Sequence, residues 1–118
     1  KPVFDAGLVD LVSTSHRVCE EVFLEPTPGH TPGHVSVHIK SNGVEAVITG
    51  DSIHHPCQIA VTDWSSSADY NSEQATATRR DFLEQYADTE TLVIGTHFAT
   101  PTAGHVKKVG AGYQFLVD

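Results

Sequence analysis

Apolar and polar side chains alternate over residues 35–40, where Val35, Val37 and Ile39 are separated by Ser36, His38 and Lys40. A period of two predicts a β-strand whose aliphatic face is buried. Residues 41–43 read Ser-Asn-Gly, and Asn and Gly tolerate the positive φ values of a tight turn. Residues 44–49 are again largely apolar, so this part of the chain is predicted to form a β-hairpin.

Further strands are predicted on both sides of this hairpin. Residues 18–24 are rich in β-branched and apolar side chains and lead into residues 25–33, where three prolines and two glycines exclude regular structure. Residues 91–95 predict a short apolar strand. Residues 105–109 and 113–117 predict a closing hairpin around a Gly-Ala-Gly turn.

One segment shows clear helical periodicity. Asn71 is a predicted N-cap, and Gln74 stands at the capping-box position three residues later. The apolar residues that follow recur at helical spacing: Ala75, Phe82, Leu83, Tyr86 and Ala87. The chain is therefore expected to run from mostly β structure through one main helix and back to β structure.

Length and charge restrict the class of protein. A chain of 118 residues forms at most one domain. Seven Lys and Arg against fifteen Asp and Glu give a net charge of -8, which argues against nucleic acid or an anionic membrane as the main partner. No apolar run approaches the roughly 18 residues that cross a bilayer. The compartment stays open, with the cytoplasm favoured.

The sequence holds no methionine and begins with Lys1. A complete translation product begins with methionine, which is usually retained before a bulky residue, so we expect a fragment or a processed chain. The two cysteines, Cys19 and Cys57, lack zinc-type spacing and are expected to be buried free thiols.

Three residues with ligand chemistry follow predicted strands or their loops: His30, Asp51 and His97. Imidazole and carboxylate are usual zinc ligands, and a carboxylate can bridge two cations, so this set suits a metal site. Taken singly, each histidine is more often a structural or surface residue than a ligand. The glycines and prolines around His30 favour a ligand role for it, because they would present the side chain in a fixed direction.

Three motifs occur together in this sequence. Residues 27–34 read Thr-Pro-Gly-His-Thr-Pro-Gly-His, residues 50–51 read Gly-Asp, and residues 95–98 read Gly-Thr-His-Phe. This combination resembles the third, fourth and fifth motifs of the metallo-β-lactamase fold hydrolases over nearly the whole chain. The stretches 50–58, 69–80 and 97–106 are most similar to the branch containing methyl parathion hydrolase and some quorum-quenching lactonases.

The resemblance implies that His30 completes the ligand set of one metal, that Asp51 bridges two metals and that His97 binds the second. The family's first motif, His-x-His-x-Asp-His, supplies four more ligands and is absent from this sequence. Residues 1–118 thus resemble the C-terminal portion of one α+β domain. The implied fold is the C-terminal half of a four-layer αβ/βα sandwich, with a mostly antiparallel or mixed sheet and one main helix.

The implied activity is metal-dependent hydrolysis of an ester, lactone or phosphotriester by a metal-bridging hydroxide. The implied cofactors are two divalent ions, most simply Zn²⁺, with Mn²⁺, Fe²⁺ or Co²⁺ as alternatives. Asp51 would have a catalytic role through the metals. His54 would face the pocket and orient substrate or donate a proton. Because three ligands divided between two ions close neither site, the isolated chain is expected to be inactive.

A non-catalytic binding or assembly module is the second hypothesis. It would form a stable homo-oligomer that covers an open sheet edge and apolar face. The presence of His30, Asp51 and His97 together favours the enzyme. The expected partners are a small ester, lactone or organophosphate substrate and either a second copy or the absent N-terminal half.

Other polar residues receive a structural interpretation. His34 is predicted to pack or form hydrogen bonds behind the site, and His38 to be a surface or inter-layer residue. Asp69, which precedes the helix, is predicted to form an ion pair with Arg79 or Arg80.

Overall fold

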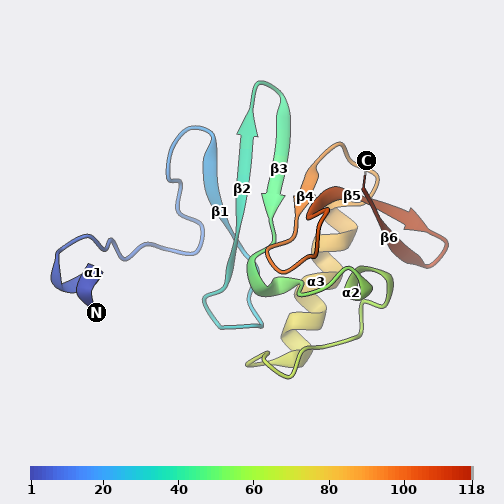
Figure 1. Ribbon diagram of the computed structural model, residues 1–118, viewed down its shortest axis with the longest axis horizontal. Coiled ribbons are helices and arrows are strands. Elements are labelled where there is room, and N and C mark those ends of the chain that lie inside the picture. The colour runs from blue at the N-terminus through green and yellow to red at the C-terminus, as the bar shows by residue number, and fades with distance from the viewer. Residues whose placement is uncertain (118) are drawn as a thin grey trace.

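The computed structural model describes residues 1–117, and Asp118 lies outside them. Six strands form one mixed sheet in chain order. Neighbouring strands are antiparallel except β3 and β4, which are parallel (Figure 1). The strands are β1 (Val22–Pro26), β2 (Val35–Ser41), β3 (Val44–Ile48), β4 (Leu92–Ile94), β5 (Ala103–Val109) and β6 (Gly112–Leu116).

One long helix, α3 (Ser72–Tyr86), connects β3 to β4 after two short helical segments, η1 (Gly50–Ser52) and α2 (Cys57–Ala60). Helix α3 packs against one face of the sheet, where Phe82, Leu83 and Tyr86 meet buried residues of β3, β4 and β5. The first helix, α1 (Pro2–Asp5), stands apart from the sheet at the end of an extended segment (Figure 1). Among residues 1–117, no helix combines the length and apolarity that a membrane crossing requires.

The hairpin and the helix cap that the local sequence predicts are confirmed. Strands β2 and β3 form the predicted hairpin, and Asn42 and Gly43 adopt positive φ at its turn. The side chain of Asn71 accepts a hydrogen bond from the Gln74 backbone N–H at 3.0 Å, as an N-cap should. Strand β1 begins at Val22 rather than at residue 18, because the N–H groups of Val18 and Cys19 turn back to the Val22 carbonyl.

The prediction for the buried face of β2 is wrong. The more deeply buried face carries Ser36 and His38, whereas Val37 and Ile39 remain partly exposed. Helix α3 covers the face that carries Ser36 and His38, and both of these polar residues have hydrogen-bond partners. Ser36 donates to the Thr49 carbonyl at 3.2 Å, which is how a buried hydroxyl avoids an unsatisfied polar group.

His38 was predicted to be either a surface or an inter-layer residue, and its burial shows that it lies between the sheet and α3. Its Nδ1 lies 3.3 Å from a carboxylate oxygen of Glu25, and its Nε2 lies 3.2 Å from one of Glu45. The Tyr86 hydroxyl of α3 donates to Glu25 and lies 3.2 Å from His38 Nδ1. This polar cluster links β1, β2, β3 and α3.

The opposite face of the sheet is aliphatic and partly exposed. Pairing aligns Val37 with Leu24 and Ile48, so the face runs across several strands. Its partly exposed members are Val22, Leu24, Val37, Ile39, Ala46, Ile48, Leu92 and Ile94. Both cysteines are free, but Cys19 is exposed and only Cys57 is partly buried, so the expectation of two buried thiols is wrong for Cys19.

Candidate metal centre

His30 lies in a loop that is fastened to the N-terminal part of α3. Gly29 adopts φ 139°, and a Cβ at this position would lie 2.3 Å from the Ala75 Cα. Only glycine therefore allows the loop to approach the helix so closely. The Thr78 hydroxyl donates to the Pro28 carbonyl at 2.6 Å, which fixes the start of the loop.

Asp51 follows β3 and is held by the same loop through His34. The His34 Nε2 accepts the Asp51 backbone N–H at 2.8 Å, and the His34 Nδ1 lies 3.0 Å from the Thr27 carbonyl oxygen. Because Nε2 must be the acceptor, Nδ1 carries the proton and donates it to Thr27. Burial lowers the pKa of His34, which keeps this ring neutral. His34 thus forms hydrogen bonds behind the site, as predicted.

His97 follows β4 and is anchored by its neighbour Phe98. The Phe98 ring is buried and packs over Gly95, where a Cβ would come within 2.2 Å of the ring. The same ring meets Phe115 edge-on, with centroids 5.2 Å apart. A buried aromatic anchor therefore fixes the turn from which His97 projects.

The Asp51 carboxylate meets two imidazoles. Its Oδ1 lies 2.6 Å from His97 Nε2, and its Oδ2 lies 3.2 Å from His30 Nε2. The hydrogen bond from His97 lowers the pKa of Asp51, and the nearby His97 and His30 rings add to this effect while burial opposes it. The three residues predicted from separate motifs are therefore brought together.

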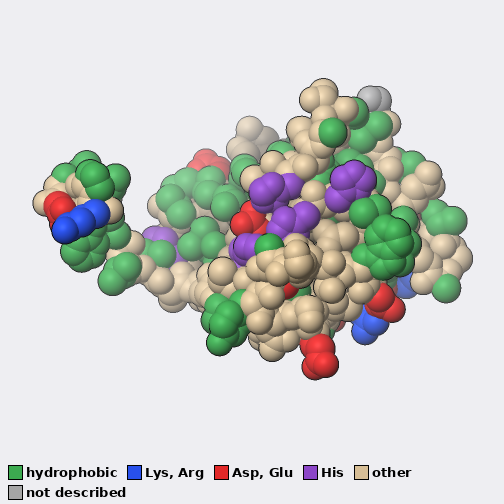
Figure 2. Space-filling view, turned by 60° about the horizontal axis from the view of Figure 1, so that its bottom comes forward, with side chains coloured by type: hydrophobic (Ala, Val, Ile, Leu, Met, Phe, Trp, Pro, Cys, Tyr) green, Lys and Arg blue, Asp and Glu red, His purple; other side chains and the backbone are tan. Residues whose placement is uncertain are grey.

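His54 lies between the two other rings. Its centroid is 5.2 Å from that of His30 and 5.1 Å from that of His97. Burial lowers the pKa of His54. Its buried Nδ1 has no hydrogen-bond partner among the described residues. Figure 2 shows this gathering of histidine side chains around acidic ones on one face.

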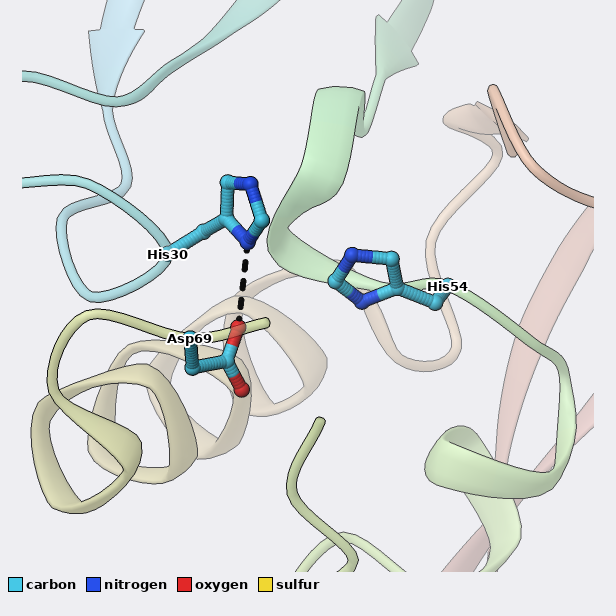
Figure 3. A group of neighbouring side chains, drawn as sticks. All are labelled: His30, His54 and Asp69. Carbon is cyan, nitrogen blue, oxygen red and sulfur yellow. Dashed lines mark hydrogen bonds and ion pairs between the residues drawn. The ribbon is translucent and has the colours of Figure 1, made fainter. Parts of the chain in front are cut away.

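Asp69 is the site residue that the sequence interpretation missed. Its Oδ1 lies 3.2 Å from His30 Nδ1 (Figure 3). Its Oδ2 accepts the Ser66 backbone N–H at 3.0 Å. The predicted ion pair with Arg79 or Arg80 is not the main contact, since Arg80 pairs with Asp63 instead. No local signal marks Asp69, because its partner His30 is 39 residues away.

The donor set fits a divalent transition metal. His30, His54 and Asp69 each offer one ligand atom, and these atoms lie within 4.8 Å of one another. Imidazole nitrogen and carboxylate oxygen suit zinc, iron, manganese and cobalt. The buried His54 Nδ1 has no hydrogen-bond partner among the described residues, so a cation or a proton donor bound beside it would satisfy an otherwise costly buried nitrogen.

Comparison with known proteins agrees with this chemistry. The family model described as "Metallo-beta-lactamase superfamily" matches residues 1–97. The chain belongs to the metallo-beta-lactamase superfamily. The expected α+β fold class is confirmed with it, since superfamily structures match this mixed sheet. No curated protein sequence matches the chain.

Solved structures of superfamily hydrolases are similar to the chain. AidC, a dizinc quorum-quenching lactonase solved with its product, shares 26% identity at a TM-score of 0.86, covering 96% of this chain and 39% of its own. The hydrolase AbOPH shares 23% identity at a TM-score of 0.90, covering 99% of this chain and 40% of its own. A probable metal-dependent hydrolase from Staphylococcus aureus shares 18% sequence identity at a TM-score of 0.74, and the match covers 96% of this chain and 42% of that protein. At 23% and 18% identity, AbOPH and the Staphylococcus aureus protein are evidence for the fold alone.

The chain thus spans about two fifths of the length of these structures. The resemblance inferred from the motifs is confirmed for the superfamily, and quorum-quenching lactonases are among the structural neighbours.

Proposed function

We propose that residues 1–118 form the C-terminal portion of one hydrolase domain that cleaves an ester, lactone or phosphotriester. The observation that carries this proposal is the convergence of His30 Nε2 and His97 Nε2 on the two oxygens of the Asp51 carboxylate. A carboxylate with one imidazole on each oxygen has the chemistry of a group that bridges two cations.

In this proposal His30, Asp51 and His97 hold divalent ions, most simply zinc. When bound, such ions lower the pKa of water to give hydroxide near neutral pH and polarise the oxygen of the scissile group. His34 keeps the Asp51 loop in position through its 2.8 Å hydrogen bond. The Asp51 side chain is 40% exposed and therefore reachable from solvent.

His54 is proposed to orient the substrate or to move a proton. It lies beside both candidate ligand rings, and burial lowers its pKa, so the ring is neutral and able to accept a proton near neutral pH. Its backbone N–H donates to the Gln58 side chain at 2.7 Å, which fixes the turn that carries it.

A lactone is the substrate class with most support, because AidC is a lactonase and is 26% identical to the chain. Aryl esters and organophosphates fit the same hydroxide mechanism. The test is zinc-dependent turnover of one member of each class by the full-length protein containing residues 1–118. Asp51→Asn should abolish turnover, and His16→Ala, at an exposed position before β1, should not. Turnover that survives Asp51→Asn would contradict the proposal.

The partly exposed aliphatic face is proposed to pair with further polypeptide, either an N-terminal half of the same domain or a second copy. Its eight aliphatic members give it the character of an interface. A reading frame with His-x-His-x-Asp-His upstream of Lys1 would support the first occupant. A start codon directly before Lys1 and a discrete dimer on size-exclusion chromatography would support an assembly module instead.

A further inference from the structure

We propose that Asp69 is a positioning residue that keeps the proton of His30 on Nδ1 and thereby leaves Nε2 free to bind metal. This inference rests on the proposed function of His30 as a ligand. The geometry is direct, because Asp69 Oδ1 lies 3.2 Å from His30 Nδ1 (Figure 3). A carboxylate can only accept, so this contact is a hydrogen bond when Nδ1 carries a proton.

Two carboxylates compete for the His30 ring. Asp69 faces Nδ1, and Asp51 faces Nε2 at the same distance of 3.2 Å. The Asp69 side chain is 1% exposed, whereas that of Asp51 is 40% exposed. Hydrogen bonds to a buried charge are stronger than those to a solvated one, so the His30 proton should reside on Nδ1, the nitrogen that faces Asp69. Without Asp69, the proton would move to Nε2 and block the nitrogen that faces Asp51.

Asp69 belongs to a tripeptide that holds His30 by its backbone as well. The Tyr70 N–H donates to the His30 carbonyl at 3.1 Å, and the Asn71 N–H donates to the Gly29 carbonyl at 3.0 Å. Asn71 also caps α3, so the tripeptide connects the helix start to the His30 loop. Side chain and backbone together restrain both the place and the direction of the ring.

The charge of Asp69 is supported from the helix. Arg79 is fully buried in α3 and donates to the Thr62 carbonyl at 3.0 Å. Burial lowers the pKa of Arg79, and the negative charge of Asp69 opposes this shift. Arg79 is therefore a buried cation that interacts electrostatically with the carboxylate facing Nδ1.

A direct metal ligand is the alternative role for Asp69, since its oxygen lies within reach of His30 and His54. The contacts favour positioning. One oxygen faces the His30 ring and the other accepts the Ser66 N–H at 3.0 Å, so both are occupied by protein groups. Ligation by Asp69 would require at least one of these contacts to break.

The test begins with the ¹⁵N chemical shifts of the two ring nitrogens of His30 in the metal-free protein. They are recorded at a pH above about 6.5, the ordinary pKa of an imidazole. Nδ1 should be protonated in the natural protein. In Asp69→Ala the proton should move to Nε2, and zinc affinity should fall about 10–100-fold. Asp69→Asn retains an accepting oxygen, so it should keep the Nδ1 proton and lose less affinity. This variant also keeps the side-chain shape should Asp69→Ala fail to fold.

Asp63→Ala is the matched control, because Asp63 lies in the same loop, is 71% exposed and pairs with Arg80. It should change neither the shift nor the affinity. An unprotonated Nδ1 in the natural protein, or a protonated Nδ1 in Asp69→Ala, would overturn the inference.

The visible absorption of the cobalt-substituted protein separates positioning from ligation. Asp69→Ala should keep the band intensity typical of the same coordination number, and a change in that number would overturn the inference. The nitrogen shifts need neither metal nor turnover. If the proposed hydrolysis is not found, the nitrogen shifts can still be measured. If the shifts contradict the role of Asp69, the proposed hydrolysis is not affected.

Discussion

The His34 Nε2 accepts the backbone N–H of Asp51 at 2.8 Å, so the loop that carries His30 also fixes the loop that carries Asp51. The two candidate ligands are 21 residues apart in the sequence. Their relative position therefore depends on one imidazole rather than on the sheet alone.

Removal of this imidazole should loosen the site. His34→Ala leaves the Asp51 N–H and the Thr27 carbonyl without their partner, which should lower the free energy of unfolding by about 1–3 kcal/mol. His34→Gln can accept with its oxygen and donate with its nitrogen, so it should recover part of the loss. Urea unfolding measures the effect, and the exposed His16→Ala is the control. Equal stability of His34→Ala and His16→Ala would show that the hydrogen bond is dispensable.

Gly29 should tolerate no side chain. Gly29→Ala would force a Cβ to 2.3 Å from the Ala75 Cα at a φ of 139°, so we expect a loss of about 2–4 kcal/mol. Gly33→Ala lies in the same loop with nothing within 4 Å of its Cβ and should cost within about 0.5 kcal/mol. Thermal unfolding of both variants tests the pair. Similar melting temperatures would mean that the loop does not rest on α3 as described.

Zinc should stabilise the fold through Asp51. If the folded protein binds zinc and the unfolded chain does not, free zinc at 100 times the dissociation constant adds about 2.7 kcal/mol. Thermal unfolding with zinc and with chelator should differ for the natural protein and much less for Asp51→Asn. His16→Ala should keep the full difference. A zinc effect of equal size in Asp51→Asn would place the ion elsewhere.

Short-range patterns predicted the local structure of this chain well. The Asn42-Gly43 turn and the Asn71 cap each depend on a few neighbouring residues, and both are confirmed. The three motif residues His30, Asp51 and His97 were predicted from loop ends and resemblance, and the fold brings them together.

Long-range partners decided what the sequence could not show. The alternation in β2 left open which face α3 would cover. His38 is buried with Glu25 3.3 Å from its Nδ1 and Glu45 3.2 Å from its Nε2, so both ring nitrogens have polar partners. Asp69 was assigned to the helix arginines because they are near in sequence. Its actual partner, His30, comes from a loop that only the folded chain brings close.

Tyr86 should make the protein sensitive to alkali. Its hydroxyl is buried and donates to Glu25, and burial followed by this hydrogen bond raises the pKa of Tyr86 far above its ordinary value of about 10. The unfolded chain therefore loses the Tyr86 proton first. The stability that this group contributes is complete below about pH 10 and decreases as the pH rises further, because the unfolded state then binds fewer protons.

Tyr86→Phe should separate this contribution from the rest of the fold. At neutral pH the variant loses one hydrogen bond to a carboxylate, about 1–2 kcal/mol, while its ring still packs on Phe82. Above about pH 10 its free energy of unfolding should decrease less steeply than that of the natural protein. Tyr70→Phe removes a hydroxyl from a side chain that is 78% exposed and should leave the steep decrease unchanged. If urea unfolding at a series of alkaline pH values gives parallel curves for the natural protein and Tyr86→Phe, the buried hydroxyl does not set the alkaline limit.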